Sequence, residues 1–394
     1  MKAGWETKNL GDLCLVVGGG TPPKDKVEYY SGDIPWATVR DMRSDVITET
    51  ECKISKEAVK ASSTNIIPKG NVVIATRVGL GKVCLLGQDT AINQDLRGIV
   101  PINPKTLSVQ FLYWWLKNTA DLIVAEGTGA TVQGVKLPFV KSLQVPHIPL
   151  SEQQRIVGIL DRAFASIAIA KANAEKNLQN SRALFESHLQ SVFTQRGEGW
   201  KQKTLEEIAA AFGRGRSKHR PRNAPHLYGG KYPFVQTGDI RNADHTITEY
   251  SQTYSEAGLA QSKLWPEGTI CITIAANIAE TAILGFDACF PDSVIGVVAN
   301  PNEADVGFIE YLLQSFKARL QAMGKGSAQA NINMGTFENE RFPFPSVADQ
   351  KQIVAKLDAL ATETQRLESI YQQKLAALDA LKKSLLHQAF SGQL

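Results

Sequence analysis

The sequence lacks the features that mark several classes of protein. Its five cysteines include no Cys-x-x-Cys pair, which argues against a disulfide framework and against a zinc knuckle. None of its six histidines pairs with another at the spacing of metal ligands. No stretch reaches the roughly 20 apolar residues that a membrane-spanning helix needs, and no signal peptide begins at Met1. We therefore expect a cytoplasmic protein that neither binds a metal nor enters a membrane.

The motifs of common catalytic sites are also missing. Gly79-Leu80-Gly81-Lys82-Val83 resembles a phosphate-binding loop, but the Walker pattern requires a glycine where Thr76 stands and a Ser or Thr where Val83 stands. Gly18-Gly19-Gly20 lacks the spacing of a dinucleotide fingerprint and predicts a turn. The Asp/Asn-Pro-Pro-aromatic segment of an amino-methyltransferase does not occur. The sequence therefore predicts neither a catalytic site nor a cofactor bound by this chain.

What the sequence does contain is an internal repeat. With 394 residues, the chain is longer than one hydrophobic core ordinarily serves. Late in each copy, a series of residues recurs 197 positions further on, and several segments recur earlier. The matching pairs include Gly4-Trp5 with Gly199-Trp200, Pro68-Lys69-Gly70 with Pro266-Glu267-Gly268, Gln153 with Gln350, and Phe193 with Phe390. We interpret the chain as a tandem duplication.

Each repeat is expected to consist of a mixed α/β globule followed by a long helix, which gives an α+β fold. Residues 1–150 and 198–346 combine short β-like runs, Gly/Pro turns and one amphipathic helix. Residues 151–197 and 347–394 are predicted helices. A capping box of Ser151 with Gln154 marks the start of the first helix, and Asp349 marks the start of the second.

Apolar residues in both predicted helices recur at alternating three- and four-residue steps, which is heptad spacing. Lys171 and Ser181 interrupt the first seam, and Thr364 and Lys374 interrupt the second. This pattern favours two helices packed on each other over a long homodimeric coil. Amphipathic helices lying on a core remain the alternative. The first seam consists of Val157, Leu160, Phe164, Ile167, Ala174, Leu178, Phe185 and Val192; the second consists of Ile353, Leu357, Leu360, Leu367, Tyr371, Leu378, Leu381 and Leu385.

A short basic segment in the second globule is the strongest candidate for nucleic-acid binding. The net charge of +4 does not by itself call for such a partner. Small residues interleave the basic ones, so the segment predicts a cationic loop that tracks phosphates and offers a guanidinium to guanine in the major groove. A solvated run of charge is the alternative. The basic residues are Arg214, Arg216, Lys218, His219, Arg220 and Arg222.

The first globule has weaker candidates, spread over turns and predicted strand ends. Each of these basic residues, taken alone, is more typical of an ordinary surface charge than of a residue that reads a base. Two Gly-rich loops, 127–133 and 324–331, would either approach a DNA backbone closely or form tight connections. The further DNA-binding candidates are Thr21, Lys24, Lys26, Arg40, Arg43, Arg77, Lys82, Arg97, Arg241 and Lys325.

Several of these segments resemble the specificity subunit of type I restriction-modification enzymes, and the resemblance covers essentially the whole chain. The second globule departs from the pattern, because Phe212-Gly213-Arg214-Gly215-Arg216-Ser217 replaces the Gly-Gly-Thr-Pro string. The resemblance rests on Leu10-Gly11-Asp12-Leu13, Gly18-Gly19-Gly20-Thr21-Pro22, Gly32-Asp33-Ile34-Pro35-Trp36, residues 149–157, residues 232–239 and residues 348–354.

The resemblance implies two target recognition domains, 1–150 and 198–346, and two conserved spacer helices, 151–197 and 347–394, that pack antiparallel. It implies that each globule reads one half of a split site in double-stranded DNA, and the departure implies that the two halves differ. Contacts with two modification subunits are expected at the two helix starts. These contact residues are Gln153, Arg155, Ile156, Gln350, Gln352 and Ile353.

The same resemblance implies that other subunits of the complex carry out the chemical reactions. The modification subunits would carry S-adenosylmethionine and methylate adenine N6, and restriction subunits would use ATP and Mg²⁺ for translocation and cleavage. The chain itself would not be an enzyme. Two other classes stay open at this point: a stand-alone nuclease, which needs a carboxylate cluster that we do not recognise, and a coiled-coil scaffold that binds no DNA.

Overall fold

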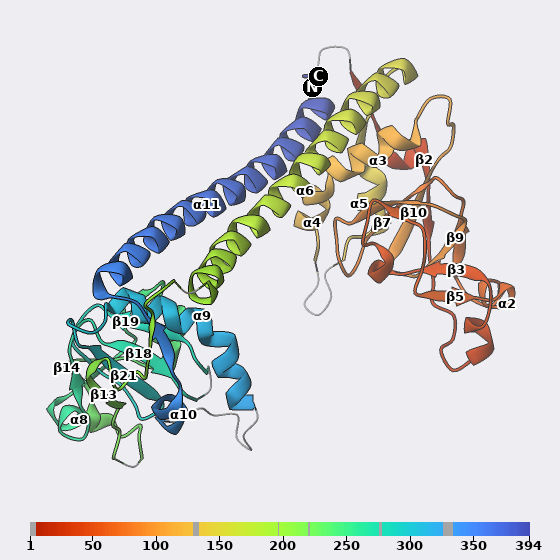
Figure 1. Ribbon diagram of the computed structural model, residues 1–394. Helices are drawn as coiled ribbons and strands as arrows, with labels where there is room; N and C mark the ends of the chain where they lie inside the picture. The colour runs from red at the N-terminus through yellow and green to blue at the C-terminus, as the bar shows by residue number, and fades with distance from the viewer. Residues whose placement is uncertain (1–4, 129–133, 196, 220, 276–277, 326–333) are drawn as a thin grey trace. The chain divides into compact units, whose positions relative to one another are not determined.

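The computed structural model describes residues 5–128, 134–195, 197–219, 221–275, 278–325 and 334–394. The chain divides into two compact units. Unit 1 comprises Met1–Glu175 and Gln373–Leu394, and unit 2 comprises Lys176–Gln372. Each unit therefore joins one globule to part of both long helices, α6 (Leu150–Thr194) and α11 (Val347–Ser391) (Figure 1). We call residues 6–147 globule 1 and residues 201–344 globule 2.

The two globules have the same strand order. Globule 1 contains a five-stranded sheet in the order β2-β10-β7-β8-β4, a four-stranded sheet in the order β5-β3-β9-β6, and the pair β1-β11. The strands are β1 (Glu6–Asn9), β2 (Cys14–Gly18), β3 (Ile34–Ala37), β4 (Val46–Ile47), β5 (Cys52–Ile54), β6 (Asn65–Ile67), β7 (Val72–Ala75), β8 (Val83–Leu86), β9 (Thr90–Ile92), β10 (Leu96–Pro101) and β11 (Gln144–His147).

Globule 2 repeats these three sheets as β13-β21-β18-β19-β15, β16-β14-β20-β17 and β12-β22. One parallel pair occurs in each large sheet, for example β4 with β8 and β15 with β19, so all four large sheets are mixed. The strands are β12 (Lys201–Lys203), β13 (Ala209–Arg214), β14 (Tyr228–Phe234), β15 (Thr246–Ile247), β16 (Gln252–Tyr254), β17 (Leu264–Trp265), β18 (Ile270–Thr273), β19 (Thr281–Leu284), β20 (Ala288–Cys289), β21 (Val294–Ala299) and β22 (Phe342–Phe344).

Helices of three to 20 residues join the strands. In globule 1 these are α1 (Leu10–Leu13), η1 (Val27–Tyr30), η2 (Val39–Asp41), α2 (Lys56–Lys60), α3 (Val109–Asn118), α4 (Ala120–Ala125) and α5 (Leu137–Ser142). In globule 2 they are η3 (Pro225–Leu227), α7 (Thr237–Asn242), α8 (Glu256–Ala260), α9 (Val306–Lys325) and α10 (Met334–Asn339). The expected α+β duplication is confirmed.

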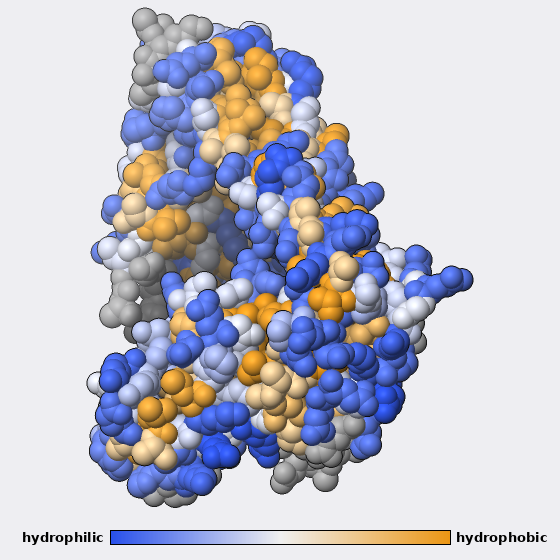
Figure 2. All heavy atoms as spheres, turned by 60° about the vertical axis from the view of Figure 1, so that its left-hand side comes forward, coloured by the Kyte–Doolittle hydropathy of each residue, from blue (hydrophilic) through white to orange (hydrophobic). Residues whose placement is uncertain are grey.

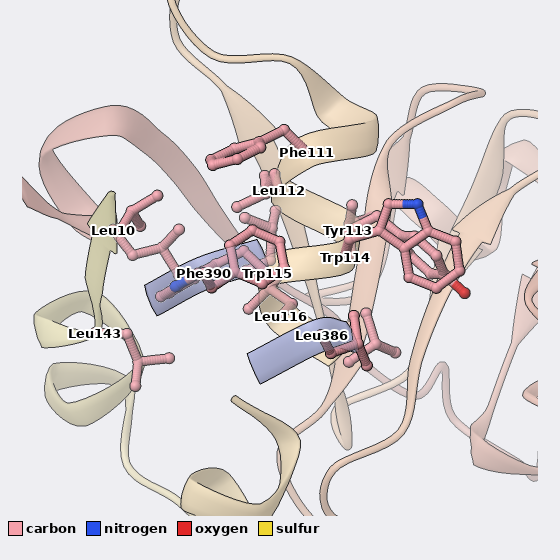
Figure 3. Close-up of a cluster of buried hydrophobic side chains, with 14 of the residues drawn as sticks. Leu10, Phe111, Leu112, Tyr113, Trp114, Trp115, Leu116, Leu143, Leu386 and Phe390 are labelled. Atoms are coloured by element: carbon pink, nitrogen blue, oxygen red, sulfur yellow. The ribbon is translucent and has the colours of Figure 1, made fainter. Parts of the chain in front are cut away.

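Helix α3 lies at the centre of the core of unit 1. Its residues from Phe111 to Leu116 are all buried, although the sequence predicted one apolar face. The cluster around them includes residues of the sheet and side chains of α6 and α11, so these six residues are buried on every face of the helix, while Gln110 at its start is exposed. Figure 3 shows Leu386 and Phe390 of α11 among the side chains of α3, and the rings of Phe111 and Phe390 lie 5.3 Å apart.

The same tie between globule and long helix occurs in both units. In unit 1, Trp114 Nε1 on α3 donates to Asp161 Oδ1 on α6 over 2.8 Å. In unit 2, the Tyr311 hydroxyl on α9 donates to Asp358 Oδ1 on α11 over 2.7 Å. An indole and a phenol thus serve the same purpose at matching positions, a substitution that preserves the donor.

The long helices run in opposite directions within each unit. Lys171 pairs with Asp379 (Nζ to Oδ1, 2.8 Å) in unit 1, and Arg182 pairs with Glu368 (Nε to Oε2, 2.9 Å) in unit 2. Ser181 is a buried seam residue whose hydroxyl bonds to the Asn177 carbonyl of its own helix. The predicted pair of long, antiparallel helices is confirmed.

Details of the predicted seams and caps are wrong. Leu381 is 47% exposed, and Phe193 is buried more deeply than the predicted Val192, which is partly buried against the same core, because α6 turns this side towards globule 2. Helix α11 is capped by Ser346, whose Oγ accepts from Asp349 N, rather than by Asp349 itself. At the matching position the first repeat has Pro149, which offers no side-chain acceptor, and α6 begins at Leu150 before the predicted cap.

Candidate DNA interface

A glycine in each globule passes unusually close to a turn. The turn 93–95 follows β9 and precedes β10, and the turn 291–293 follows β20 and precedes β21. A Cβ on Gly19 would lie 2.2 Å from the Asn93 carbonyl oxygen, and a Cβ on Gly215 would lie 2.2 Å from the Phe290 carbonyl oxygen. Only glycine permits this approach. It holds the segment after the first sheet strand against the same turn in both globules.

In globule 1 this junction borders an open cleft of about 680 Å³. Three of the predicted DNA-binding residues, Thr21, Lys24 and Arg40, line it. Gln94 and Asp95, from the tip of the turn, line the same cleft, and the Thr21 hydroxyl bonds to the Gln94 side-chain oxygen. Residues from three separate chain segments therefore meet around Gln94.

Hydrogen bonds fix the shape of this turn. The buried Asn93 side chain accepts from Asp95 N (3.1 Å) and donates to Asp95 Oδ2 (3.0 Å). The Arg97 guanidinium donates to the Gln94 carbonyl oxygen over 2.9 Å, and burial lowers the pKa of Arg97 from its usual value. The Gln94 side chain is exposed on this ordered frame. A rigid backbone presenting an exposed amide is suited to reading a base edge.

The remaining candidates of globule 1 lie around the cleft or near it. Arg77 NH1 lies 3.7 Å from Asp95 Oδ1 at the wall of the cleft. Arg43 is paired with Glu51, which also lines the cleft. Lys26 donates to the Tyr29 hydroxyl (3.3 Å), and Lys82 is exposed in the loop between β7 and β8. These groups offer positive charge to phosphates rather than base-reading geometry.

In globule 2 the turn 291–293 carries an aspartate in place of the glutamine. The Asp292 carbonyl oxygen accepts from Arg214 Nε over 2.7 Å, and Asp292 Oδ2 accepts from Arg222 NH2 over 2.7 Å. Both arginine side chains stay exposed. The structure thus gathers two members of the predicted basic loop on one residue, Arg214 on its backbone carbonyl and Arg222 on its carboxylate, and leaves both exposed.

Lys263 adds a positive charge that sequence reasoning missed. Its Nζ lies 3.4 Å from the centre of the Trp265 ring. Burial and the nearby charge of Arg216 lower the pKa of Lys263. A cation whose charge is disfavoured by burial and by a neighbouring cation gains from an anionic partner. Lys218 is exposed in the same loop.

Three predicted residues fall elsewhere. Arg241 lies on α7 beside another cavity of about 500 Å³, which Lys317 and Phe185 also line, so the structure does not bring it to the basic loop. Arg220 lies outside the described residues, as does the side chain of Lys325 at the end of α9. Most of the two predicted Gly-rich loops, 129–133 and 326–331, is also outside the described part.

The predicted partner contacts at the helix starts need correction. Gln153 and Gln350 are 0% exposed and bind inside their own units. Gln153 Oε1 accepts from Ser108 N (2.8 Å), and Gln350 Oε1 accepts from Asp305 N (2.8 Å). Ile156 is buried as well. The prediction assumed that a polar residue repeated at both helix starts lies on the surface. These two amides instead tie each globule to a long helix, and they are not accessible to a partner.

The other members of that set are accessible in part. Arg155 is exposed, forms a two-pronged pair with Glu152 and donates to the Leu394 carbonyl oxygen. Gln352 is exposed and Ile353 is half-buried.

On the face drawn in Figure 2, hydrophilic side chains predominate and hydrophobic ones form scattered groups.

Across the described ranges, no three His, Cys, Asp or Glu side chains are grouped so that they could hold a metal ion. None of the helices in the described part combines the length and apolar character that crossing a membrane requires.

Known proteins resemble both halves of the chain. It is 34% identical to the EcoR124I/EcoR124II specificity subunit of Escherichia coli over 164 aligned residues. The aligned segment covers 40% of each protein. It is 22% identical over 414 residues to the MjaIX specificity subunit of Methanocaldococcus jannaschii, which covers 99% of this chain and 93% of that protein.

Two solved structures share the fold over their whole length. The HsdS subunit of Thermoanaerobacter tengcongensis has a TM-score of 0.68 at 19% identity, over 100% of this chain and 98% of that one. A chain from a structure of complex assembly and conformational transition in the type I R-M system has a TM-score of 0.80 at 20% identity, over 100% and 99%. The family model for the type I restriction modification DNA specificity domain matches residues 2–180 and again 197–376. Since these two matches span most of both repeats, the chain belongs to the family of type I restriction-modification DNA specificity subunits.

Proposed function

We propose that the two globules read two different short sequences of one bipartite, asymmetric DNA site. The observation that carries this is the pair of equivalent turns, which have the same backbone setting but present Gln94 in one globule and Asp292 with its arginines in the other. Two readers with the same frame and different side chains recognise different half-sites. The target recognition domains are residues 1–150 and 198–346, and the spacer helices are residues 151–197 and 347–394.

Positive groups around each turn supply the phosphate contacts. In globule 1 these are Lys24, Arg40 and Arg77, and in globule 2 they are Arg216 and Lys263. Phosphate contacts fix the register of a protein on DNA but carry no sequence information. Thr21, Lys26, Arg43, Lys82, Arg97, Lys218 and Arg220 remain part of the proposed interface.

The partners are two modification subunits, which dock on the long helices. Exposed apolar side chains on these helices suit such docking: Leu184 is 51% exposed and Leu381 is 47% exposed. These two leucines occupy matching positions in the two repeats, as one surface presented to two copies of one partner requires. Of the residues predicted to contact a partner, Arg155 and Gln352 are exposed polar residues near the helix starts.

The chain is the recognising part of the complex, and catalysis belongs to its partners. The modification subunits bind S-adenosylmethionine and methylate adenine N6, whereas restriction subunits use ATP and Mg²⁺. The complex acts in the cytoplasm, where the host DNA is.

Footprinting of the chain assembled with its modification subunits tests the proposal. We expect two protected segments of unlike sequence, separated by base pairs whose identity does not matter. One continuous, palindromic footprint would overturn it. A mobility-shift assay with and without the modification subunit provides the control, because a scaffold that binds no DNA would shift neither sample.

A further inference from the structure

The turns 93–95 and 291–293 are equivalent in detail. The Asp95 carbonyl oxygen accepts from Thr76 N over 2.8 Å, and the Ser293 carbonyl oxygen accepts from Ile274 N over 3.0 Å. Thr76 and Ile274 each follow the matching strands β7 and β18. With the glycine approach described above, two independent contacts place Gln94 and Asp292 at the same position of the same frame.

Gln94 has the geometry of a direct base reader. Its side chain is exposed at the cleft, and the Thr21 hydroxyl donates to its side-chain oxygen. That oxygen keeps a second lone pair, and within the described residues nothing bonds to the amide NH₂. An amide with one acceptor and one donor side by side matches the N6 and N7 groups of adenine in the major groove.

Asp292 has a different chemical task. A carboxylate at this tip accepts hydrogen bonds only, and it is already occupied by Arg222, while its backbone carbonyl holds Arg214. Each guanidinium has five N–H groups, so both arginines retain donors that point away from Asp292. Such donors match the O6 and N7 acceptors of guanine.

We infer that the tip of this turn sets the class of base that each globule reads. Gln94 contacts an adenine directly, and Asp292 positions Arg222 through its carboxylate and Arg214 through its backbone carbonyl, both on guanine. The inference rests on the proposed function and deepens it, because it assigns the base class within each half-site. Gln94 is a specificity-determining residue under this assignment, and Asp292 is a positioning residue.

The experiment maps N6-methyladenine at single-base resolution in cells that express the full chain with its modification subunit. The wild-type chain defines a two-part motif. Replacing Gln94→Ala should make one A·T position of one half-site degenerate, with at least a roughly tenfold loss of discrimination, while the other half-site stays strict. Gln94→Arg should convert that same position from adenine towards guanine. A gain of this kind does not arise from misfolding.

Replacing Asp292→Ala should relax the G·C position that Arg222 reads in the opposite half-site, because Arg222 loses its carboxylate partner, whereas Arg214 keeps the backbone carbonyl. Asp292→Glu should restore much of the discrimination because it keeps the carboxylate. A merely structural loss would lower methylation of every site without changing the motif. The matched control is Gln110→Ala, an exposed glutamine on α3 outside the cleft, which should leave both half-sites unchanged.

Two results would overturn the inference. An unchanged motif in the Gln94→Ala and Gln94→Arg variants shows that the tip reads nothing, and relaxation at a G·C position by Gln94→Ala shows that the base class is wrong. Failure of the proposed function looks different, because the wild-type chain would then give no two-part motif at all.

Discussion

His245 and Glu310 form an ion pair inside unit 2, in which Nδ1 lies 2.7 Å from Oε2 of a carboxylate that is wholly buried. His245 directly precedes β15, and Glu310 is on α9. Unit 1 has a comparable pair, Asp45 before β4 and Lys117 on α3, with Nζ 2.9 Å from Oδ1, although Lys117 lies one turn beyond Tyr113, which is the residue that matches Glu310. Both pairs tie an edge strand to the central helix of the globule, and their charges are reversed.

The His245–Glu310 pair makes the stability of unit 2 depend on pH. The hydrogen bond to Glu310 raises the pKa of His245 above its usual value, although burial opposes this, and the charges of Glu310, Asp358 and Asp244 add to the rise. A raised pKa means that the contribution is complete below the unfolded value of about 6.5 and is lost as the pH rises through the folded value. Unit 2 should therefore weaken between neutral and alkaline pH.

Replacing His245→Asn measures this contribution. Asparagine tolerates the left-handed backbone of this position (φ 64°), so the variant removes the cation rather than straining the chain. We expect unfolding of unit 2 to become easier by about 3 kcal/mol at pH 6, because Glu310 loses its counter-charge, and by less at pH 9. Hydrogen exchange of α9 in both proteins at both pH values provides the measurement.

The control for this prediction is Asp379→Asn, which breaks the exposed pair with Lys171. An exposed pair contributes at most about 1 kcal/mol, so exchange in unit 1 should hardly change. An equal effect of His245→Asn at pH 6 and pH 9 would contradict the titration of His245.

The buried glutamines should be structural anchors. Gln153→Ala leaves Ser108 N and the Thr106 and Ile148 carbonyl oxygens without their partner, and Gln350→Ala does the same to Asp305 N and the Pro345 carbonyl oxygen. Each loss should cost about 3 kcal/mol, because buried backbone groups become unsatisfied. Hydrogen exchange at the start of α6 or α11 reports each site separately.

Exposed neighbours give matched controls for these two variants. Gln154→Ala and Gln352→Ala remove the same side chain from the surface and should change local exchange by at most about 0.5 kcal/mol. If the buried and exposed substitutions behaved alike, the anchoring role of Gln153 and Gln350 would be refuted.

The architecture could be predicted from the sequence because each pattern that indicates a helix or a globule occurs in both repeats. A constant spacing from Gln153 to Phe193 and from Gln350 to Phe390 indicated equivalent long helices, and the structure has α6 and α11 of 45 residues each. The same spacing misled the interpretation of Gln153 and Gln350. Repetition shows that a residue matters, but burial, which the spacing does not contain, decides whether it faces a core or a partner.

The candidate interface was predicted only in part. Charge clusters in sequence revealed Arg214 to Arg222, whereas Gln94 and Asp292 carried no local signal, because single polar residues in turns are common. Their importance depends on β9 and β20 bringing these turns against Gly19 and Gly215, which are far from them in the chain. Aligning the two repeats residue by residue at these turns is the one sequence signal that would have found them.

Glycine at positions 19 and 215 should be indispensable for this junction. An alanine Cβ would meet backbone oxygen at 2.2 Å in either place, and a backbone atom cannot move aside cheaply. Gly215→Ala should cost about 3 kcal/mol and displace the turn that carries Asp292. Gly238→Ala, where nothing lies within 4 Å, is the control and should leave stability unchanged or raise it. Thermal unfolding of both variants compares them.

The basic loop of globule 2 should carry a measurable share of the salt dependence of DNA binding. If Arg216 and Lys263 contact phosphates, replacing each with alanine should weaken binding to all sequences about equally and reduce the slope of log K against log salt by about 1. Replacing Arg216 and Arg220 together should flatten the slope further. Lys201→Ala, an exposed lysine on β12, is the control and should leave affinity and slope unchanged. Titration of labelled duplex DNA at several salt concentrations gives both quantities. The slope reports how many counterions the DNA releases on binding, whatever its base sequence. An unaltered slope in the Arg216 and Lys263 variants would therefore mean that these two side chains face solvent and do not contact phosphates.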